Sequence, residues 1–540
     1  MNRRLAVLAL ALTLAACSKA PDSPKVAAPA ASKAAAIAIA AAPSAPAGQA
    51  AHDDGIAWRK GDVDAAFATA KAENKPVFLY WGAIWCPPCN QVKATLFNRQ
   101  DFIERSRFFI PVYIDGDSPG AQKEGARFNV SGYPTMILFT PDGKEITRLP
   151  GEVESDQYMR VLALGMNGAK PVKATLAAAL APGERSKLSP EDWRMLSYYS
   201  WITDEQQLLP KKDVAPTLAK LAKACPADQK DTAARLDLQA LVAAADQKEA
   251  KPPADAAAAD RVIAVLSDNE LARKNFDTIA YYADKVPEYL VAAKPDARPR
   301  LVTAWNVSLD RFIADPTLST DDRLSATNAK IQLARLDTPK GVVPEPLLTL
   351  VREQAAKAEK GTTDVYARQS VISNAADVLA EAGLLDESDA MLTAELKRSH
   401  SPYYFMLGLA SNAKKRGDKT TELEWRHKAY DAAKGPATRL QWGVGYVRAL
   451  LDYVPDDAAR IESAAGQVIG ELEATPETFY ERNRRGLERM GKQLVAWNKN
   501  NQHKASLDRL RAQMSTVCSK LPAKDPARAT CEGTLQPAKA

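Results

Sequence analysis

Histidine, cysteine and charge of one sign are all scarce in this chain of 540 residues. Its four His are scattered without metal-ligand spacing, so we expect no metal site and no cofactor. Six Cys are too few for a disulfide-dense scaffold. The 72 Lys and Arg against 66 Asp and Glu leave a formal charge of only +6, without a long block of one sign. This balance is too weak to predict a nucleic-acid partner.

Long apolar runs are confined to the N-terminus, where residues 1–17 read MNRRLAVLALALTLAAC. A membrane-spanning helix needs about 20 apolar residues, and this run is only about half as long. Two Arg followed by such a run are typical of a signal peptide. The end of the run, Leu14 to Cys17, resembles the lipobox of bacterial lipoproteins, in which the Cys is lipidated and becomes the first mature residue. A plain secretory peptide with a chance Cys is the alternative.

Lipidation at Cys17 would anchor the chain to the periplasmic side of a bacterial membrane. Ser18, rather than an Asp at that position, favours the outer membrane. Export also implies an oxidising compartment for the other cysteines. The following stretch, 18–52, is rich in Ala and Pro and poor in large apolar side chains. Because such a composition cannot bury enough surface to fold, we expect a disordered tether there.

Short apolar runs and amphipathic stretches alternate over residues 53–170. Their order predicts helix, strand, helix, strand, helix, hairpin and helix. The segments that the pattern places are helices over 62–74, 91–97 and 155–167, and strands over 77–81, 110–114, 136–140 and 145–149. The last two strands are joined by Pro141-Asp142-Gly143-Lys144, which is a hairpin signal.

The strand over 77–81 leads into Trp85-Cys86-Pro87-Pro88-Cys89 at a predicted helix start. Free N–H groups and the helix dipole at that position favour the Cys86 thiolate, and Cys89 can attack a mixed disulfide formed there. Pro87 and Pro88 fit the first turn but remove two N–H donors, which favours a less acidic Cys86 and a more reducing pair. Half of a zinc site and an inert structural disulfide are the alternatives. Zinc needs about four ligands, however, and the sequence has no second CxxC.

Two motifs in this region resemble signatures of the thioredoxin-fold family. Trp85 to Cys89 matches the active-site motif, and Gly132-Tyr133-Pro134-Thr135 matches the loop whose cis-proline packs against the Cys pair. The resemblance covers residues 53–170 and implies an α/β thioredoxin fold, with a central mixed sheet flanked by helices. The sequence around the first motif is similar to bacterial exported thioredoxin-like proteins and to the electron-delivering domain of DsbD.

The same resemblance implies roles for individual residues. Cys86 would be the catalytic nucleophile of thiol–disulfide exchange, and Cys89 the resolving thiol. The side chain of Trp85 would line the site, Pro134 would shape the partner groove, and Tyr133 would offer backbone groups to a bound peptide. These roles imply protein thiols and disulfides as the partners of the site.

One position departs from the family. Thioredoxin has a buried acid six residues before its first Cys, thought to carry the proton of the resolving thiol, and Tyr80 stands there in this sequence. A phenol is a poor base at neutral pH. Water, or an acid such as Asp115 or Glu124, would have to replace it. The departure affects the expected rate of the resolving step and leaves the redox chemistry in place.

After a linker over 171–188, residues 189–540 show apolar residues at helical spacing and no strand pattern. We therefore expect a large all-α domain. Turns at Gly383, Gly417 and Pro455 recur at intervals of 34 and 38 residues. This spacing resembles degenerate tetratricopeptide-like helical hairpins, which leave a concave surface for proteins or peptides. A plain helical bundle without a binding groove is the alternative.

The three remaining cysteines are structural in this interpretation. Cys518 and Cys531 lie close together near the C-terminus of an exported chain, so we expect a disulfide between them. Cys225 is left over, and we expect it to be a buried small apolar residue rather than a regulatory thiol.

The predicted function is thiol–disulfide oxidoreductase activity in the bacterial cell envelope. The Cys86–Cys89 pair would reduce protein disulfides, with a DsbD-like protein as the electron donor. A disulfide oxidase or isomerase is one alternative. A non-enzymatic lipoprotein scaffold, whose helical module binds protein partners, is the other.

Overall fold

The structure, a computed structural model, describes residues 55–149, 154–168, 170–247, 255, 257–338 and 341–537. The predicted signal peptide, the lipidation site Cys17 and the tether over 18–52 lie outside the described residues. Residues from Asp53 onward form one compact unit. In the described part of the chain, no helix has the length and apolar character that a membrane span requires.

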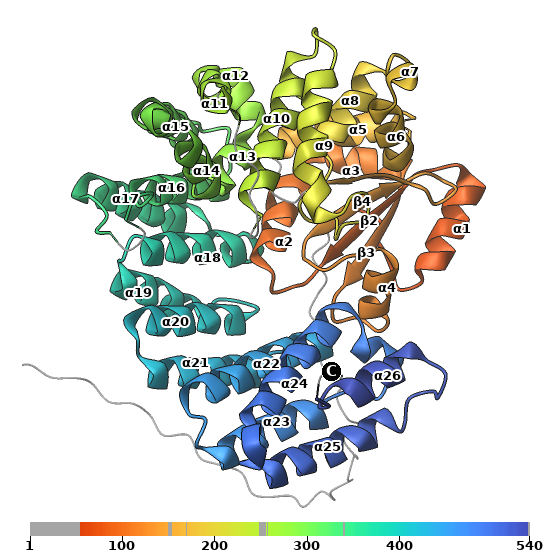
Figure 1. Ribbon diagram of the computed structural model, residues 1–540, viewed down its shortest axis with the longest axis vertical. Coiled ribbons are helices and arrows are strands. Elements are labelled where there is room, and N and C mark those ends of the chain that lie inside the picture. Colours follow the sequence, from red (N-terminus) through yellow and green to blue (C-terminus); the bar gives the residue numbers. More distant parts are fainter. Residues whose placement is uncertain are drawn as a thin grey trace, which may run out of the picture. The chain divides into compact units, whose positions relative to one another are not determined.

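A five-stranded mixed sheet forms the centre of the N-terminal part (Figure 1). Its strands, in the spatial order β1-β3-β2-β4-β5, are β1 Arg59–Lys60, β2 Val77–Gly82, β3 Ile110–Asp115, β4 Thr135–Phe139 and β5 Glu145–Leu149. β2 is parallel to β3 and antiparallel to β4, and β4 forms the expected hairpin with β5. All six residues of β2 are buried, because this strand lies in the middle of the sheet.

Helices cover both faces of this sheet. They are α1 Val63–Glu73, α2 Pro87–Val92, the π-helix η1 Lys93–Phe97, α3 Gln100–Arg105, the 3₁₀ helix η2 Ser106–Phe108, α4 Ala121–Arg127 and α5 Ser155–Met166. Alternate residues of β2 divide between the two cores: Leu79 packs with Val63 of α1, and Tyr80 packs with Leu96 of η1. The thioredoxin fold and the predicted order of its main elements are confirmed. The sequence pattern missed β1 and α3, which are too short to show a period.

The expected linker over 171–188 is folded into two helices, α6 Val172–Leu180 and α7 Pro182–Arg185. Leu176 and Ala179 of α6 are buried in the same core as Trp193. The segment is therefore part of the folded helical region and not a free linker.

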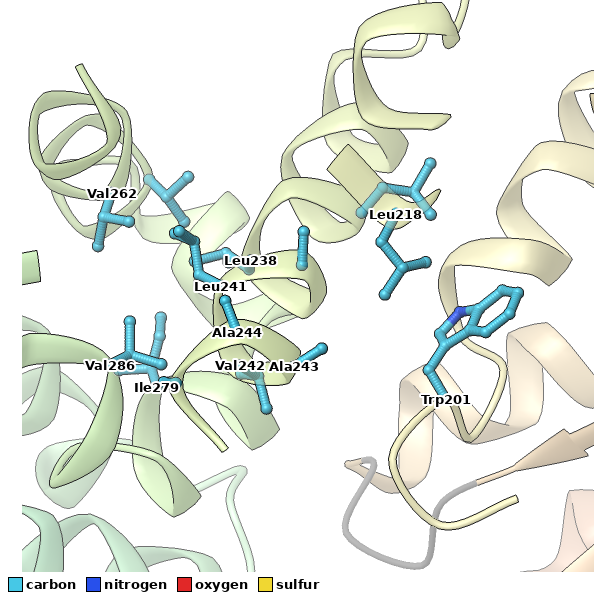
Figure 2. Packing of buried hydrophobic residues seen from close by; sticks show 14 of the residues in the cluster. Trp201, Leu218, Leu238, Leu241, Val242, Ala243, Ala244, Val262, Ile279 and Val286 are labelled. Atoms are coloured by element: carbon cyan, nitrogen blue, oxygen red, sulfur yellow. The ribbon is translucent and has the colours of Figure 1, made fainter. Parts of the chain in front are cut away.

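The rest of the described chain is helical, as the apolar spacing predicts. Its helices are α8 Pro190–Ser197, α9 Lys211–Ala224, α10 Lys230–Ala245, α11 Ala258–Ser267, α12 Asn269–Lys274, α13 Phe276–Tyr281, α14 Lys285–Ala293, η3 Pro295–Ala297, α15 Arg298–Ala314, α16 Thr320–Ala334, α17 Glu345–Gly361, α18 Val365–Glu381, α19 Leu385–Glu395, α20 Pro402–Arg416, α21 Lys419–Ala432, α22 Pro436–Tyr453, α23 Ala458–Gly470, η4 Pro476–Phe479, α24 Glu481–Trp497, η5 Lys499–Asn501, α25 Lys504–Cys518 and α26 Pro526–Gly533. We call residues 189–537 the helical module. Its first core surrounds α10, whose Leu238, Leu241 and Val242 lie between neighbouring helices (Figure 2).

Successive helices of the middle part form hairpins at the predicted turns. Gly383 lies between α18 and α19 and Gly417 between α20 and α21, both with positive φ, and Pro455 lies between α22 and α23. Pro402 and Pro436 occupy the first turns of α20 and α22. Each helix from α17 to α22 packs against the next one along the chain. The 34-residue interval therefore marks real helix pairs.

The remaining cysteines lie in the helical module. A disulfide joins Cys518 at the end of α25 to Cys531 in α26, and both residues are buried. Cys225, the C-cap of α9, is half-buried rather than fully buried. Burial still raises the pKa of its thiol to about 11, so the thiolate is disfavoured there.

Candidate functional site

Cys86 and Cys89 lie at the point where β2 gives way to α2. Cys86 is the N-cap residue of α2, and its side chain accepts a hydrogen bond from the backbone N–H of Cys89 at 3.2 Å. A disulfide joins the two residues, whose Cα atoms are 5.2 Å apart. Pro87 and Pro88 fill the first two helical positions, as their sequence predicts. The arrangement therefore places one sulfur at a helix N-terminus with a neighbouring sulfur one turn away.

The second predicted motif lies beside the first. The peptide bond between Tyr133 and Pro134 is cis, and the ring of Tyr133 meets that of Trp85 edge-on, with 6.3 Å between centroids. The Tyr133 hydroxyl accepts a hydrogen bond from Gln122 on α4 at 3.1 Å. The structure thus brings the cis-proline loop close to Trp85, which directly precedes the Cys pair.

Below the Cys pair, Tyr80 is part of an aromatic stack. Its buried ring stacks on Tyr113 with 5.2 Å between centroids, and Phe97 packs edge-on against it. Tyr113 donates to Asp115 at 3.0 Å, and burial raises the Tyr113 pKa well above its usual value. Glu124, the other acid considered for the proton transfer, pairs with Arg127 on α4. Apolar and phenolic groups therefore occupy the place of the family's buried acid.

Trp85 makes its polar contacts with the helical module. Its indole Nε1 donates to Oγ1 of Thr438 on α22 at 2.7 Å, and its carbonyl accepts from Gln369 on α18 at 3.2 Å. The ring stacks on Tyr404 of α20 and meets Trp442 of α22 edge-on, with centroid separations of 5.9 and 4.8 Å. The side chain predicted to line the site is therefore held by three helices of the module.

Asp117, in the loop after β3, completes this contact. Its carboxylate accepts from the backbone N–H of Thr438 at 2.8 Å and from the Thr438 hydroxyl. Burial raises the Asp117 pKa to about 6. One Thr side chain thus links two loops of the thioredoxin domain, accepting from Trp85 and donating to Asp117.

Arg482 of α24 covers the cis-proline loop. Its guanidinium lies 4.6 Å from the centroid of the Tyr133 ring and donates to the Ser131 carbonyl at 3.3 Å. It also donates to Gln441 of α22 at 2.9 Å. Because burial is the largest influence on this guanidinium, the Arg482 pKa is lowered. A cation–π contact therefore holds the loop that carries Tyr133.

α18 packs directly against α2, and buried carboxyl groups lie close to this contact (Figure 1). Asp321 of α16 accepts from the Ser370 hydroxyl at 2.6 Å, and Asp322 lies 3.4 Å from Gln91 of α2. Burial raises the pKa of Asp321 to about 7 and that of Asp322 to about 6. Elsewhere at this contact, the His400 ring donates to the Ile84 carbonyl at 3.2 Å.

Among the predicted site residues, Trp85, Pro87 and both cysteines are buried, Tyr133 and Pro134 are half-buried, and Pro88 is exposed. Cys86 is 3% exposed, Cys89 0% and Trp85 8%. No local pattern marks Gln369, Thr438 or Arg482 as partners of the site, because the chain separates them from it by hundreds of residues. These three residues are recognised as partners of the site only because the packing of the whole module places them next to it.

Two other features lie away from the cysteines. A groove of about 1320 Å³ is lined by α1, the β4–β5 hairpin and α6, and it includes Phe67, Lys71 and Lys173. His427 is exposed and stacks on Tyr446, as expected of a surface residue. Among the described residues, no group of three or more His, Cys, Asp and Glu side chains could hold a metal ion.

Comparisons with known proteins place the similarity in the N-terminal part. A family model described as a thioredoxin-like domain matches residues 63–165. Thioredoxin of Mycobacterium tuberculosis (strain ATCC 25618 / H37Rv) is 35% identical over 103 residues, which are 19% of this chain and 84% of that protein. The thiol:disulfide interchange protein DsbD of Actinobacillus pleuropneumoniae is 30% identical over 95 residues, 17% of this chain and 16% of DsbD. The chain therefore spans only about a sixth of the length of such DsbD relatives.

A solved structure of a DsbH oxidoreductase matches 22% of this chain over 92% of its own length, at 16% sequence identity and with a TM-score of 0.19. The fold and the Cys86–Cys89 disulfide together support thiol–disulfide oxidoreductase chemistry. Because the mycobacterial thioredoxin is matched over most of its length, this chain belongs to the thioredoxin-fold family.

Proposed function

We propose that this protein is a thiol–disulfide oxidoreductase of the bacterial cell envelope that reduces disulfides in other proteins. The observation that carries the proposal is the Cys86–Cys89 disulfide at the start of α2, beside the loop of Tyr133 and cis-Pro134. A pair so placed can alternate between a disulfide and two thiols by exchange with other thiols.

The reaction uses the two sulfurs in sequence. In the reduced protein, the Cys86 thiolate attacks one sulfur of a client disulfide, and the client's other sulfur leaves as a thiolate. The Cys89 thiolate then attacks Sγ of Cys86, which restores the Cys86–Cys89 bond and releases the client's first sulfur. Two electrons have passed from the Cys pair to the client, whose disulfide has become two thiols.

Return of the pair to its reduced form needs an external dithiol. A DsbD-like protein is our proposed donor, since its dithiol would attack the Cys86–Cys89 bond by the same exchange and leave as a disulfide. The predicted signal peptide and the lipobox-like sequence that ends at Cys17 support a proposed lipid-anchored position on the periplasmic side, with the outer membrane favoured. Such a compartment is oxidising, so a reductant there depends on this supply of electrons.

The equilibrium redox potential tests the direction of the reaction. The full chain would be titrated against reduced and oxidised glutathione, and the state of Cys86 and Cys89 read by alkylation and mass spectrometry. We expect a value close to that of thioredoxin, about −270 mV. A value near that of DsbA, about −120 mV, would make the protein an oxidant and overturn the proposed direction.

Insulin reduction tests the activity itself. Wild-type protein with dithiothreitol should precipitate insulin chains faster than dithiothreitol alone, and the Cys86→Ser variant should not. If a cellular phenotype of gene deletion is rescued by Cys86→Ser as well as by the wild type, the helical module acts as a scaffold and the enzymatic proposal fails.

A further inference from the structure

The helical module lies on the face of the thioredoxin domain that a client would have to reach. We call this face, made of Trp85, Cys86, Tyr133 and Pro134, the client face. Attack on a disulfide requires the incoming thiolate to approach along the sulfur–sulfur axis, so the sulfur must be accessible. Cys86 is only 3% exposed and Trp85 8%. Both cysteines are therefore buried in this arrangement, whereas Pro88 between them is exposed and Tyr133 and Pro134 are half-buried.

Matched polar contacts hold the face closed. Thr438 both accepts from the Trp85 indole and donates to Asp117, so each buried polar group of this set has a partner. Gln369 donates to the Trp85 carbonyl, and its own side-chain oxygen accepts from Ser399 at 2.6 Å. Such complementarity distinguishes a specific docking contact from helices that merely lie close.

The backbone of the helical module makes one very close contact with the thioredoxin domain, at Gly435. Gly435, just before α22, has a φ of +87°, and a Cβ there would overlap the Asp117 carboxyl group. The backbone of the module can therefore approach Asp117 only because this residue has no side chain. On the other side of the site, Arg482 lies over the Tyr133 ring.

The contact between the helical module and the client face is partly polar and partly apolar. Thr438, Gln369, Arg482 and Asp117 are polar groups that water can satisfy once the two parts move apart. Tyr404 and Trp442 pack on the Trp85 ring, and other apolar side chains of the module share the core that contains Cys86. A client that binds this face would have to replace both kinds of contact.

We infer that the helical module is an intramolecular gate, which competes with client proteins for the client face and must move away before Cys86 can react. The inference rests on the proposed function, because only a reactive Cys86 needs a gate. A reductant in an oxidising compartment gains from this device, since its pair stays out of exchange until the module is displaced.

The test measures how fast dithiothreitol reduces the Cys86–Cys89 disulfide in the full chain. Samples are quenched with an alkylating reagent at set times, and peptide mass spectrometry reports each disulfide separately. Two variants weaken the gate from different helices: Thr438→Val removes the hydroxyl that joins Trp85 to Asp117, and Arg482→Ala removes the group over Tyr133. We expect each to speed reduction about tenfold, since each leaves buried polar groups unpaired.

Matched controls separate gating from general loosening. Thr516→Val changes an exposed Thr of α25, and Arg484→Ala changes a more exposed Arg of the same helix as Arg482. Both should react at the wild-type rate. The buried Cys518–Cys531 disulfide, in the same molecules, reports unfolding of the module, and its rate should stay the same in every variant.

Each outcome decides one proposal. Equal rates in the wild type and both gate variants overturn the gate, and so does a parallel rise at Cys518–Cys531, which would show that the module has unfolded. Failure of Cys86–Cys89 to exchange with dithiothreitol or glutathione in any variant, including the opened ones, overturns the proposed function instead. Faster reduction of Cys86–Cys89 alone supports both.

Discussion

The indole Nε1 of Trp85 lies 2.7 Å from Oγ1 of Thr438, although 353 residues separate the two in sequence. This hydrogen bond joins the residue next to the predicted nucleophile to α22 of the helical module. The surroundings of the Cys pair therefore depend on the module as well as on the thioredoxin fold.

Loss of this bond should lower stability by a measurable amount. In Trp85→Phe the ring still packs against Tyr404 and Trp442, but the N–H donor is gone. We expect the free energy of unfolding in urea to fall by about 1 kcal/mol. Trp497→Phe is the control, because its N–H donates to the Pro455 carbonyl in a more exposed setting. A loss at Trp497 equal to that at Trp85 would contradict a special role for the buried bond.

The two cysteines should differ in what their variants accumulate. Cys86→Ser lacks the attacking sulfur and should form no mixed disulfide with a client. Cys89→Ser should attack normally and then stall, because nothing resolves the bond. Non-reducing gels of the two variants, incubated with a disulfide-containing protein, show the difference. Cys225→Ser, which changes a half-buried thiol outside the motif, should behave like the wild type.

The position of the Cys motif at a helix start and the order of elements in the thioredoxin fold could be predicted from the sequence. A buried strand such as β2 is continuous and apolar, and Cys86 at a helix start follows from the prolines after it. These are local features, so a short stretch of sequence contains all the information. Gly383 and Gly417 each lie at the end of a helix, where a residue with positive φ is common and glycine is favoured. The spacing of these glycines therefore shows the interval between helical hairpins in the sequence.

The covering of the site could not be predicted, because it depends on contacts over several hundred residues. Gln369, Thr438 and Arg482 are ordinary polar residues of helices, and nothing in their neighbourhood differs from a solvated face. Their contacts with the thioredoxin fold depend on how the stacked helices are arranged in space, which the local sequence does not determine. The helices α18, α20 and α22, in which the sequence predicts a surface for partners, contact Trp85 of the same chain.

The disulfide between Cys518 and Cys531 should stabilise the end of the module without affecting redox activity. It closes a short loop with a sequence separation of 13. Its removal in a Cys518→Ala, Cys531→Ala double variant should cost about 3 kcal/mol, because a closed loop of this size limits the unfolded chain. Urea denaturation measures the loss. Insulin reduction by the variant should equal that of the wild type, and a loss of activity would contradict a purely structural role.

Stability should fall as the pH rises from about 4 to about 7. Burial raises the pKa of Asp117 and Asp322 to about 6 and that of Asp321 to about 7, from an ordinary value of 3.8. The folded protein therefore binds protons that the unfolded chain has already released in this range. Each group stabilises the fold when protonated, and this contribution is lost as pH passes the folded pKa.

Urea denaturation at pH 5 and pH 7.5 checks this sign. Asp321→Asn keeps an acceptor for Ser370 but cannot ionise. The fall in its free energy of unfolding between pH 5 and pH 7.5 should therefore be smaller than that of the wild type, by on the order of 2 kcal/mol. Asp386→Asn, at a fully exposed carboxyl group, should keep the wild-type difference. A wild-type protein that is more stable at pH 7.5 than at pH 5 would contradict the prediction.

Gly435→Ala should open the contact between the two domains. The substitution strains a backbone with φ +87° and ψ 143°, a region that residues other than glycine avoid, and it drives a methyl group into the Asp117 carboxylate. We expect a loss of about 2 kcal/mol or more and faster reduction of Cys86–Cys89. Backbone strain alone would give the same sign, so the single variant does not separate the two causes.

A double-mutant cycle with Asp117→Ala separates them. The methyl group that Gly435→Ala introduces collides first with the Asp117 side chain, so removing that side chain should restore about 1 kcal/mol of the stability lost at position 435. If backbone strain were the whole cause, Asp117→Ala would not relieve it and the two losses would add. Gly417→Ala provides the reference, because that glycine also has positive φ but a Cβ there would meet nothing within 4 Å. Coupling at Gly435 and additivity at Gly417 would show that the module packs directly against the Asp117 side chain at position 435.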